Sequence, residues 1–369
     1  MKILHIINSL EFGGAEKLLV DTLPVYVSKG LNADVLVLKE KETPFMLQLS
    51  KVQGVNILSI KKINGLYNPL YIIKLLKYIQ NYDIVHVHLF PAIYWASLSS
   101  FLFRKRTCLV LTEHNTENRR RKLLIFKYLD RFIYRRYSKI IAISEAVRIN
   151  LENHLGSKFK NIVQINNGID LNIFKKAIPY EKKDLGLEKD TKTIIQVSSF
   201  TAQKDQTTLI RAMVQLPKRV HLQLVGDGPL REDAIKLVLS LGLEDRVHFL
   251  GHRTDVPRLL KTSDISVLSS HYEGFGLAMV EGMAAGNACL GSNVPGLSEI
   301  IGEDGILFPP GDEIVLRQKL FRLIHDKDYF RNTVKKCKQK AESYDCKLMV
   351  QRHIDLYRSL YDRHDISLK

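Results

Sequence analysis

The chain has 369 residues, of which 45% are hydrophobic and 25% are charged. This length is enough for two domains of ordinary size or one large domain, and the composition excludes general disorder. The 55 Lys and Arg residues outnumber the 39 Asp and Glu residues, which gives a formal net charge of +16. Almost all of the excess in the first half lies between residues 61 and 139, so the first half is basic in one region and the second half is nearly balanced.

The four cysteines are scattered and form no C-x-x-C pair, which argues against a zinc site and a disulfide framework. Reduced thiols in the cytoplasm are the simplest interpretation. No apolar run approaches the ~18 residues that a membrane-spanning helix needs. Residues 2–10 are apolar but too few for a signal peptide, and we predict that they form a first strand running into a loop.

Short apolar runs alternate with helix-length segments along the whole chain. Runs apolar on both faces and rich in Val and Ile are typical of parallel strands covered by helices, and their alternation with helices predicts doubly wound α/β sheets. Seven runs precede residue 172: 3–7, 35–38, 57–60, 84–89, 109–112, 140–144 and 162–165. Six follow it: 194–198, 222–225, 247–250, 265–269, 288–291 and 306–308.

A polar stretch over residues 172–190 interrupts this pattern and is interpreted as a linker. We therefore predict two Rossmann-like, doubly wound domains, residues 1–172 and 173–345. Residues 346–369 are expected to form an amphipathic C-terminal helix. Parallel sheets bind ligands at the carboxyl ends of their strands, so two facing crevices would form a cleft between the domains.

The first domain has two candidate loops at strand ends. Gly13 and Gly14 let the backbone approach a ligand closely, and free N–H groups at the start of the following helix attract phosphate. The loop is not G-x-G-x-x-G, so a nicotinamide oxidoreductase is disfavoured. His114, beside Asn115, could bond a sugar hydroxyl or a phosphate. His86 and His88 alternate on one strand and are interpreted as structural.

The second domain has more candidate loops. Lys204 could place a point charge on a phosphate. Glu273 and Glu281 flank glycines at 274 and 276, whose backbone N–H groups would open a helix and bind anions or hydroxyls. The loop 293–299 could close one wall of the same crevice. A structural turn at residues 226–229 is also clear.

Taken in order, these segments resemble the retaining glycosyltransferases of family 4, which have the GT-B fold. The resemblance covers essentially the whole chain and includes the segments 13–16, 167–170 and 226–229. Its most specific motif is E-x7-E, from Glu273 to Glu281. The resemblance implies an acceptor-binding N-terminal domain, a donor-binding C-terminal domain, and a C-terminal helix that packs back on the N-terminal domain.

The resemblance also implies roles for individual residues. His114, Lys204 and Glu273 would be catalytic, with His114 on the transferred sugar or the acceptor, Lys204 on the diphosphate and Glu273 on sugar hydroxyls. Gly14, His114 and Asn115 would bind the acceptor, and Glu281 the ribose. The donor-binding set would be Gly13, Gly14, Ser199, Lys204, Gly274, Phe275, Gly276, Leu277, Val280 and Glu281.

One position departs from the family pattern. The family usually has an arginine five residues before the lysine that matches Lys204, and here that residue is Ser199. An arginine–lysine pair would neutralise a leaving diphosphate better than one lysine does. The sequence leaves three alternatives open: another cation replaces the missing arginine, the backbone mainly holds the donor phosphate, or the activity is reduced.

The implied reaction is a metal-independent hexosyl transfer from a UDP- or GDP-sugar to a glycan or lipid-linked glycan, in surface polysaccharide or glycoconjugate synthesis. No cofactor is expected, and no convincing D-x-D motif calls for a metal. The acceptor hydroxyl would attack the face that the phosphate leaves. Two alternatives remain: a nucleotide-sugar epimerase, opposed by the E-x7-E motif, and a non-catalytic scaffold, favoured by Ser199 and opposed by Lys204 and both glutamates.

Residues 119–139 combine nine Lys or Arg residues with one acidic residue, Asp130, and interleaved apolar residues. Such a stretch either lies on an anionic membrane surface or packs as a solvated helix on its own domain. Nucleic acid is a poorer partner, because no nucleic-acid-binding motif accompanies the charge. We expect a cytoplasmic protein that associates peripherally with the inner membrane face.

Overall fold

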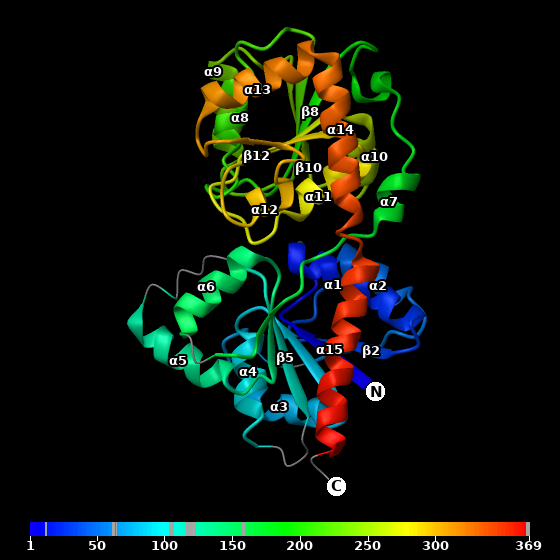
Figure 1. Ribbon diagram of the computed structural model, residues 1–369, viewed down its shortest axis with the longest axis vertical. Coiled ribbons are helices and arrows are strands. Elements are labelled where there is room, and N and C mark those ends of the chain that lie inside the picture. Colours follow the sequence, from blue (N-terminus) through cyan, green and yellow to red (C-terminus); the bar gives the residue numbers. More distant parts are fainter. Residues whose placement is uncertain are drawn as a thin grey trace. The chain divides into compact units, whose positions relative to one another are not determined.

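The computed structural model divides the chain into two compact units (Figure 1). Unit 1 contains Met1–Gly168 and Cys346–Lys369, and unit 2 contains Ile169–Asp345. The structure describes residues 1–11, 13–60, 63, 65–102, 107–115, 121, 123–156 and 159–366, with side chains to residue 362.

Unit 1 is a parallel sheet with helices on both faces, in the strand order β3-β2-β1-β4-β5-β6-β7. Its strands are β1 Lys2–Ile7, β2 Asn32–Val37, β3 Ile57–Ser59, β4 Ile84–His88, β5 Cys108–Glu113, β6 Lys139–Ala142 and β7 Ile162–Gln164. Its helices are α1 Gly14–Ser28, α2 Pro44–Ser50, α3 Leu70–Ile79, α4 Ala92–Ser99, α5 Leu124–Tyr134, α6 Glu145–Leu155 and α15 Cys346–Ile366.

Unit 2 repeats the plan, with the strand order β10-β9-β8-β11-β12-β13. Its strands are β8 Lys192–Val197, β9 Val220–Val225, β10 Val247–Gly251, β11 Ile265–Leu268, β12 Ala288–Ser292 and β13 Ile306–Phe308. Its α-helices are α7 Leu171–Lys176, α8 Gln206–Ala212, α9 Arg231–Ser240, α10 Val256–Thr262, α11 Leu277–Ala285, α12 Leu297–Ile301, α13 Glu313–His325 and α14 Lys327–Glu342.

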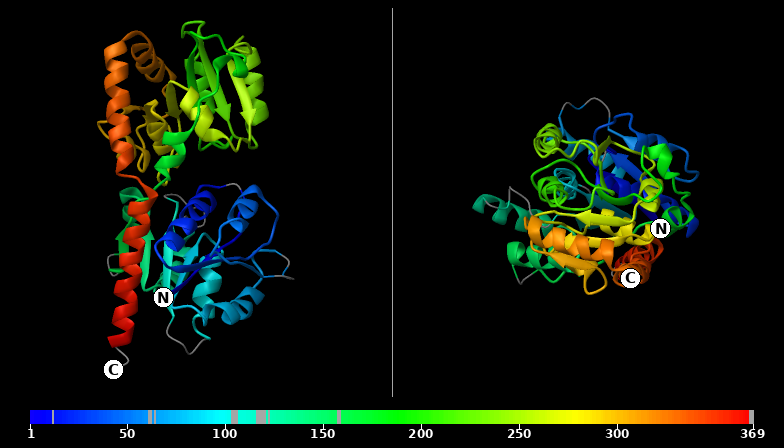
Figure 2. Two further views of the ribbon diagram at one scale, coloured as in Figure 1. Left: turned by 90° about the vertical axis from the view of Figure 1, so that its right-hand side faces the viewer. Right: turned by 90° about the horizontal axis from the view of Figure 1, so that it is seen from above.

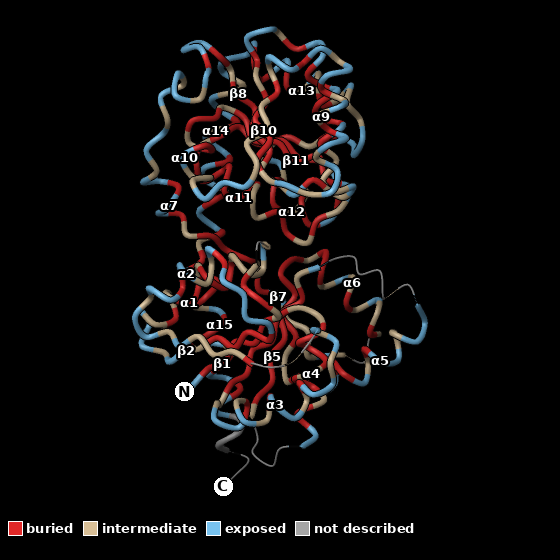
Figure 3. The backbone as a smooth tube through the Cα atoms, turned by 180° about the vertical axis from the view of Figure 1, so that it is seen from behind, coloured by how far each residue is buried: buried red, intermediate tan, exposed pale blue. Residues whose placement is uncertain are grey.

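Each predicted apolar run coincides with a strand, because the interior of both sheets is buried on both faces. Residues 3–7 of β1 are all buried, as are all the residues of β4, β5 and β11. Figure 3 shows this pattern, with the labelled strands mostly buried and the exposed surface on helices and loops. The prediction of two Rossmann-like domains is confirmed.

The unit boundary differs from the predicted one at 172/173. Residues 171–176 form helix α7, and Phe174 is buried inside unit 2, so the predicted linker begins with a packed element. The C-terminal segment forms the long helix α15, which packs beside α1 in unit 1 (Figure 2). Tyr26 of α1 bonds His353 of α15 through its hydroxyl, 2.6 Å from the ring Nδ1.

Candidate active site

The carboxyl ends of β8 and β11, which are neighbours in the sheet of unit 2, bring Lys204 and Glu273 together. Nζ of Lys204 lies 2.5 Å from Oε1 of Glu273, and the same oxygen accepts a hydrogen bond from Ser270 Oγ at 2.7 Å. The side chains of Lys204 and Glu273 are 20% and 7% exposed. The sequence singled out both charges, but only the structure shows that they pair.

Hydrogen bonds between the two loops hold this pair in place. The Gln203 carbonyl accepts from the His271 backbone N–H at 2.8 Å, and the Gln203 amide donates to the Tyr272 carbonyl at 2.8 Å. Ser269 Oγ donates to the Lys204 carbonyl at 3.1 Å. The sequence did not predict that Gln203, Ser269 and Ser270 hold Lys204 and Glu273 in place. Their position after a buried strand was the one feature of the sequence that pointed to this role.

The Gly-rich segment after Glu273 opens helix α11. Gly276 adopts a positive φ of 88°, which a side chain would disfavour, and α11 begins at the next residue. The backbone N–H groups at a helix start attract anions. Phe275 has its ring buried edge-to-face against Tyr344, with 5.5 Å between the ring centroids, so only its backbone is left for a ligand.

Helix α11 is buried along most of its length, which decides what its side chains can reach. Leu277 is partly exposed, whereas Val280 has 0% exposed surface. The side chain of Val280 is thus packed in the interior, and its place in the donor-binding set stays a prediction. Glu281 is 5% exposed and lies in the second turn of the same helix, so the structure keeps a nearly buried carboxylate there.

Two further loops pack against this region. A Cβ at Gly296 would lie 2.4 Å from the carbonyl oxygen of Glu273, so the loop 293–299 lies directly on the Glu273 backbone. A Cβ at Gly226 would lie 2.2 Å from the Ser198 carbonyl oxygen, so the 226–229 turn packs on the loop that carries Ser199. Ser199 is exposed and accepts a hydrogen bond from Gln206 through its carbonyl oxygen at 2.9 Å.

In unit 1, Gly13 and Gly14 lie where predicted, at the start of α1. Gly13 is the extended residue before the helix, and Gly14 is its first residue. The Glu16 carboxylate folds back over Gly13, where a Cβ would lie 2.1 Å from Oε2 of Glu16, and burial raises the pKa of Glu16. A phosphate approaching this helix start would therefore meet a carboxylate that is easier to protonate than usual.

His114 and Asn115 follow β5. His114 is partly exposed, and its Nε2 lies 3.2 Å from Nδ1 of His88. Burial lowers the pKa of His114 to about 4, so the ring is neutral at pH 7. Asn115 is exposed, and its backbone N–H donates to Glu113 Oε1 at 3.4 Å. His86 and His88 are buried, in agreement with their structural interpretation.

The predicted basic stretch 119–139 is divided by the fold. Arg121 has a side chain that is only 7% exposed, and it pairs with the buried carboxylate of Glu113, which also accepts from Tyr134 Oη at 2.8 Å. Arg121 is therefore unavailable to a membrane surface, contrary to the expectation for the whole stretch. Asp130 is fully buried and bonds His154 Nε2 at 2.8 Å. Residues 119, 120 and 122 lie outside the described residues.

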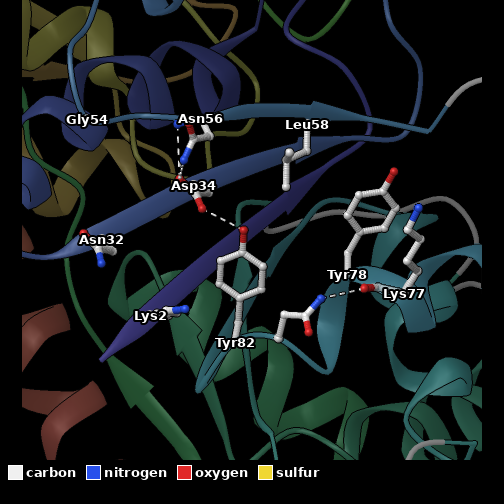
Figure 4. Close-up of a pocket in the computed structure, with 10 residues that line it drawn as sticks. Lys2, Asn32, Asp34, Gly54, Asn56, Leu58, Lys77, Tyr78 and Tyr82 are labelled. Carbon is white, nitrogen blue, oxygen red and sulfur yellow. Dashed lines mark hydrogen bonds between the residues drawn. The ribbon is translucent and has the colours of Figure 1, made fainter.

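A polar cavity of about 570 Å³ lies at the opposite, amino-terminal edge of the unit 1 sheet (Figure 4). Its central carboxylate, Asp34, accepts from Tyr82 Oη at 2.7 Å and from Asn56 through its backbone and amide nitrogens at 3.1 and 2.9 Å. These polar groups satisfy one another. The cavity is also remote from the carboxyl strand ends, so we do not assign the reaction to it.

Comparison with known proteins identifies the family. The family described as "Glycosyl transferases group 1" matches residues 178–344, and "Glycosyltransferase Family 4" matches residues 12–173. The N-acetyl-alpha-D-glucosaminyl L-malate synthase of Bacillus anthracis is 31% identical over 291 residues, which cover 75% of each chain. This chain belongs to the family 4 glycosyltransferases. The fold and the family expected from the sequence are thus confirmed.

Two further relatives place this glycosyltransferase among its neighbours. An Escherichia coli UDP-Gal:alpha-D-GlcNAc-diphosphoundecaprenol alpha-1,3-galactosyltransferase is 29% identical over 82% of this chain and 81% of its own. The crystal structure of Anabaena Alr3699/HepE in complex with UDP and glucose is 25% identical, with a TM-score of 0.85, over 97% of this chain and all of the other. None of the described helices of this glycosyltransferase combines the length and apolar character needed to cross a bilayer.

Proposed function

We propose that this family 4 glycosyltransferase is a metal-independent, retaining hexosyltransferase that uses a UDP- or GDP-sugar and a lipid-linked glycan acceptor. The observation that carries the proposal is the Lys204–Glu273 pair beside the start of α11. The E. coli relative, whose name specifies a UDP-sugar and a diphosphoundecaprenol-linked acceptor, and the UDP-bound Anabaena structure support the choice of substrates.

Lys204 is proposed to stabilise the leaving diphosphate. Breaking the bond between the sugar and the diphosphate builds negative charge on the phosphate, and a cation already in position lowers that barrier electrostatically. The bound donor would draw Lys204 from Glu273, because a diphosphate carries more negative charge than one carboxylate. With Ser199 uncharged at the position of the usual arginine, Lys204 and the N–H groups at the start of α11 carry this role.

Glu273, once its bond to Lys204 weakens, accepts hydrogen bonds from hydroxyls of the transferred sugar, and Glu281 accepts them from the ribose. The acceptor hydroxyl attacks the anomeric carbon from the face that the phosphate leaves. The bond from that carbon to the phosphate oxygen breaks, the bond to the acceptor oxygen forms, and the phosphate takes the acceptor proton. No covalent intermediate on the enzyme is needed.

Unit 1 is proposed to bind the acceptor through Gly14, His114 and Asn115. It also carries a surface suited to an anionic membrane. On α5, Leu124, Ile125 and Tyr128 are 76%, 70% and 70% exposed. A surface helix normally turns such residues inward, and apolar side chains beside basic ones are typical of helices that lie in a lipid interface. Peripheral association would bring a lipid-linked acceptor to the enzyme.

The experiment is nucleotide release from a panel of UDP-, GDP- and ADP-sugars, with membrane extract as acceptor, for the native protein and for Glu281→Ala. Glu313→Ala, which removes a half-exposed carboxylate in unit 2, is the matched control. Release from one donor, with a raised KM in Glu281→Ala alone, is the expected result. Epimerised nucleotide sugar without transfer, or no binding of any donor in a thermal-shift screen, would contradict the proposal.

A further inference from the structure

A row of three imidazoles crosses three neighbouring strands of unit 1. β1, β4 and β5 are adjacent in the sheet, and they carry His5, His88 and, directly after β5, His114. Nδ1 of His5 lies 3.1 Å from Nε2 of His88, and Nδ1 of His88 lies 3.2 Å from Nε2 of His114. Both nitrogens of His88 are thus used, and the three rings form an unbroken hydrogen-bonded chain.

His86 lies beside this chain without belonging to it. Its Nδ1 lies 2.5 Å from Tyr357 Oη and its Nε2 lies 2.6 Å from Thr112 Oγ1, so both of its nitrogens are satisfied. Although the ligand atoms of His5, His86 and His88 all lie within 4.8 Å of one another, His86 would have to break both bonds to hold a metal ion. The geometry therefore favours a hydrogen-bond network over a metal site.

The chain of imidazoles has two ends of different character. At one end, Nε2 of His5 is a buried nitrogen with no hydrogen-bond partner. At the other end, His114 is partly exposed, and no hydrogen bond joins its Nδ1 to any residue in the described part of the chain. Nδ1 of His114 is therefore the atom of this row of imidazoles that can bond a ligand.

The unsatisfied end decides the direction of the hydrogen bonds. A neutral imidazole carries one N–H and one bare nitrogen, so the chain has only two proton arrangements. In one, Nε2 of His5 carries a buried N–H without an acceptor. In the other, that nitrogen is bare. Buried N–H groups without partners are rarer than acceptors without partners, which favours the second arrangement.

We propose that His5 and His88 are positioning residues that hold His114 in the tautomer with its proton on Nδ1. His5 Nδ1–H donates to His88, His88 Nδ1–H donates to His114, and His114 Nδ1–H donates to the substrate. This inference rests on the proposed acceptor-side role of His114 and deepens it. His114 then donates to an oxygen of the sugar, the phosphate or the acceptor, and it is not the base that removes the acceptor proton.

Burial agrees with a chain of neutral rings. It lowers the pKa of His5 to about 3 and that of His114 to about 4, and it lowers the pKa of His88 well below its usual value. The tautomer of a neutral histidine is set by the bond that its other nitrogen makes, so each ring passes its preference to the next.

The test reads the tautomer directly by long-range ¹H–¹⁵N NMR of the ¹⁵N-histidine-labelled protein at pH 7.5, with His114 assigned from the spectrum of His114→Gln. The native protein is expected to show His114 protonated on Nδ1. His5→Leu removes the first donor and should give a mixture of tautomers. His5→Asn places an amide donor near Nδ1 and should restore the native signal. A native His114 found with its proton on Nε2 would overturn the proposal.

A matched control and an activity readout complete the test. His86→Gln lies in the same buried cluster but outside the chain, and it should leave the His114 signal unchanged even if it lowers stability. Once the donor and the acceptor are known, the kcat of sugar transfer should fall about ten-fold in His5→Leu and recover in His5→Asn. Unchanged His114 signals in His5→Leu would refute the inference, whereas native tautomers with no sugar transfer would refute only the proposed function.

Discussion

Nζ of Lys204 and Oε1 of Glu273 lie 2.5 Å apart, although 69 residues separate them in the chain. The two loops that carry them follow neighbouring strands, and two hydrogen bonds of Gln203, with His271 and Tyr272, join these loops. The cation proposed for the diphosphate is thus held by the carboxylate proposed for the sugar. When the donor binds, Lys204 would exchange the carboxylate of Glu273 for the diphosphate, so the lysine would be paired before and after binding.

Lys204→Met is expected to lower kcat by roughly 10²–10³-fold, the loss typical of removing one preorganised charge stabiliser. Lys204→Arg keeps the charge and should retain more activity. Lys192→Met is the control, since Lys192 forms a 2.8 Å ion pair with Asp264 at the amino end of β8. Nucleotide release measures all three. Equal losses in Lys204→Met and Lys192→Met would assign the effect to stability.

Gly282→Ala should destabilise unit 2, because α11 packs closely on β11 at this position. An added Cβ would lie 2.5 Å from Oγ and 2.7 Å from Cβ of Ser266. Overpacking of this kind typically costs about 1–3 kcal/mol. Urea unfolding followed by circular dichroism measures the loss. Ser266→Gly removes the side chain that the new Cβ would meet, so Gly282→Ala should cost less stability in the Ser266→Gly background than in the native protein. An equal loss of stability in both backgrounds would argue against this packing.

Unit 1 should lose stability as the pH falls below about 6. Burial lowers the pKa of His353 to about 3. In the unfolded chain this ring binds a proton near pH 6.5, whereas in the folded chain it stays neutral at that pH. Each such histidine reduces the free energy of unfolding by up to about 1.4 kcal/mol for each pH unit below its unfolded pKa, and has no effect well above it. Urea unfolding at pH 8, 6 and 5 checks this.

The fluorescence of Trp95 reports this unfolding selectively, because it is the single tryptophan of the chain and lies in α4 of unit 1. His353→Asn keeps a polar partner for Tyr26 and removes the titrating ring, so the dependence on pH should become shallower. The exposed His325→Asn is the control. An unchanged slope in His353→Asn would show that this ring is not the source.

Binding to vesicles that contain anionic lipid should weaken when the exposed apolar residues of α5 are removed. Ile125→Ser with Tyr128→Ser is expected to lower the bound fraction at least ten-fold, since burying each side chain in lipid contributes about 1.5–3 kcal/mol. Ile178→Ser, at a 74% exposed position of unit 2, is the control. Flotation at low and at high salt separates the apolar contribution from the electrostatic attraction to anionic lipid, because salt screens only the second. Native protein that fails to float with anionic vesicles would rule out this surface.

The strands and the candidate loops could be predicted from the sequence because both depend on local patterns. A strand buried on both faces needs an apolar run, as in residues 84–88, and a ligand loop needs glycines and polar residues directly after it, as in residues 273–276. The E-x7-E spacing also follows from one loop and one helix. These features lie within short segments, so their resemblance to a family was visible without the fold.

Only the tertiary structure decided which of these residues meet. The Lys204–Glu273 pair, the burial of Val280 and the pairing of Arg121 with Glu113 depend on contacts between different strands and helices. The histidine row depends on strand order, because β1 and β5 are brought to either side of β4 only when the sheet assembles. Sequence patterns report the surroundings of each residue along the chain, whereas charge pairing and tautomers depend on neighbours across the fold.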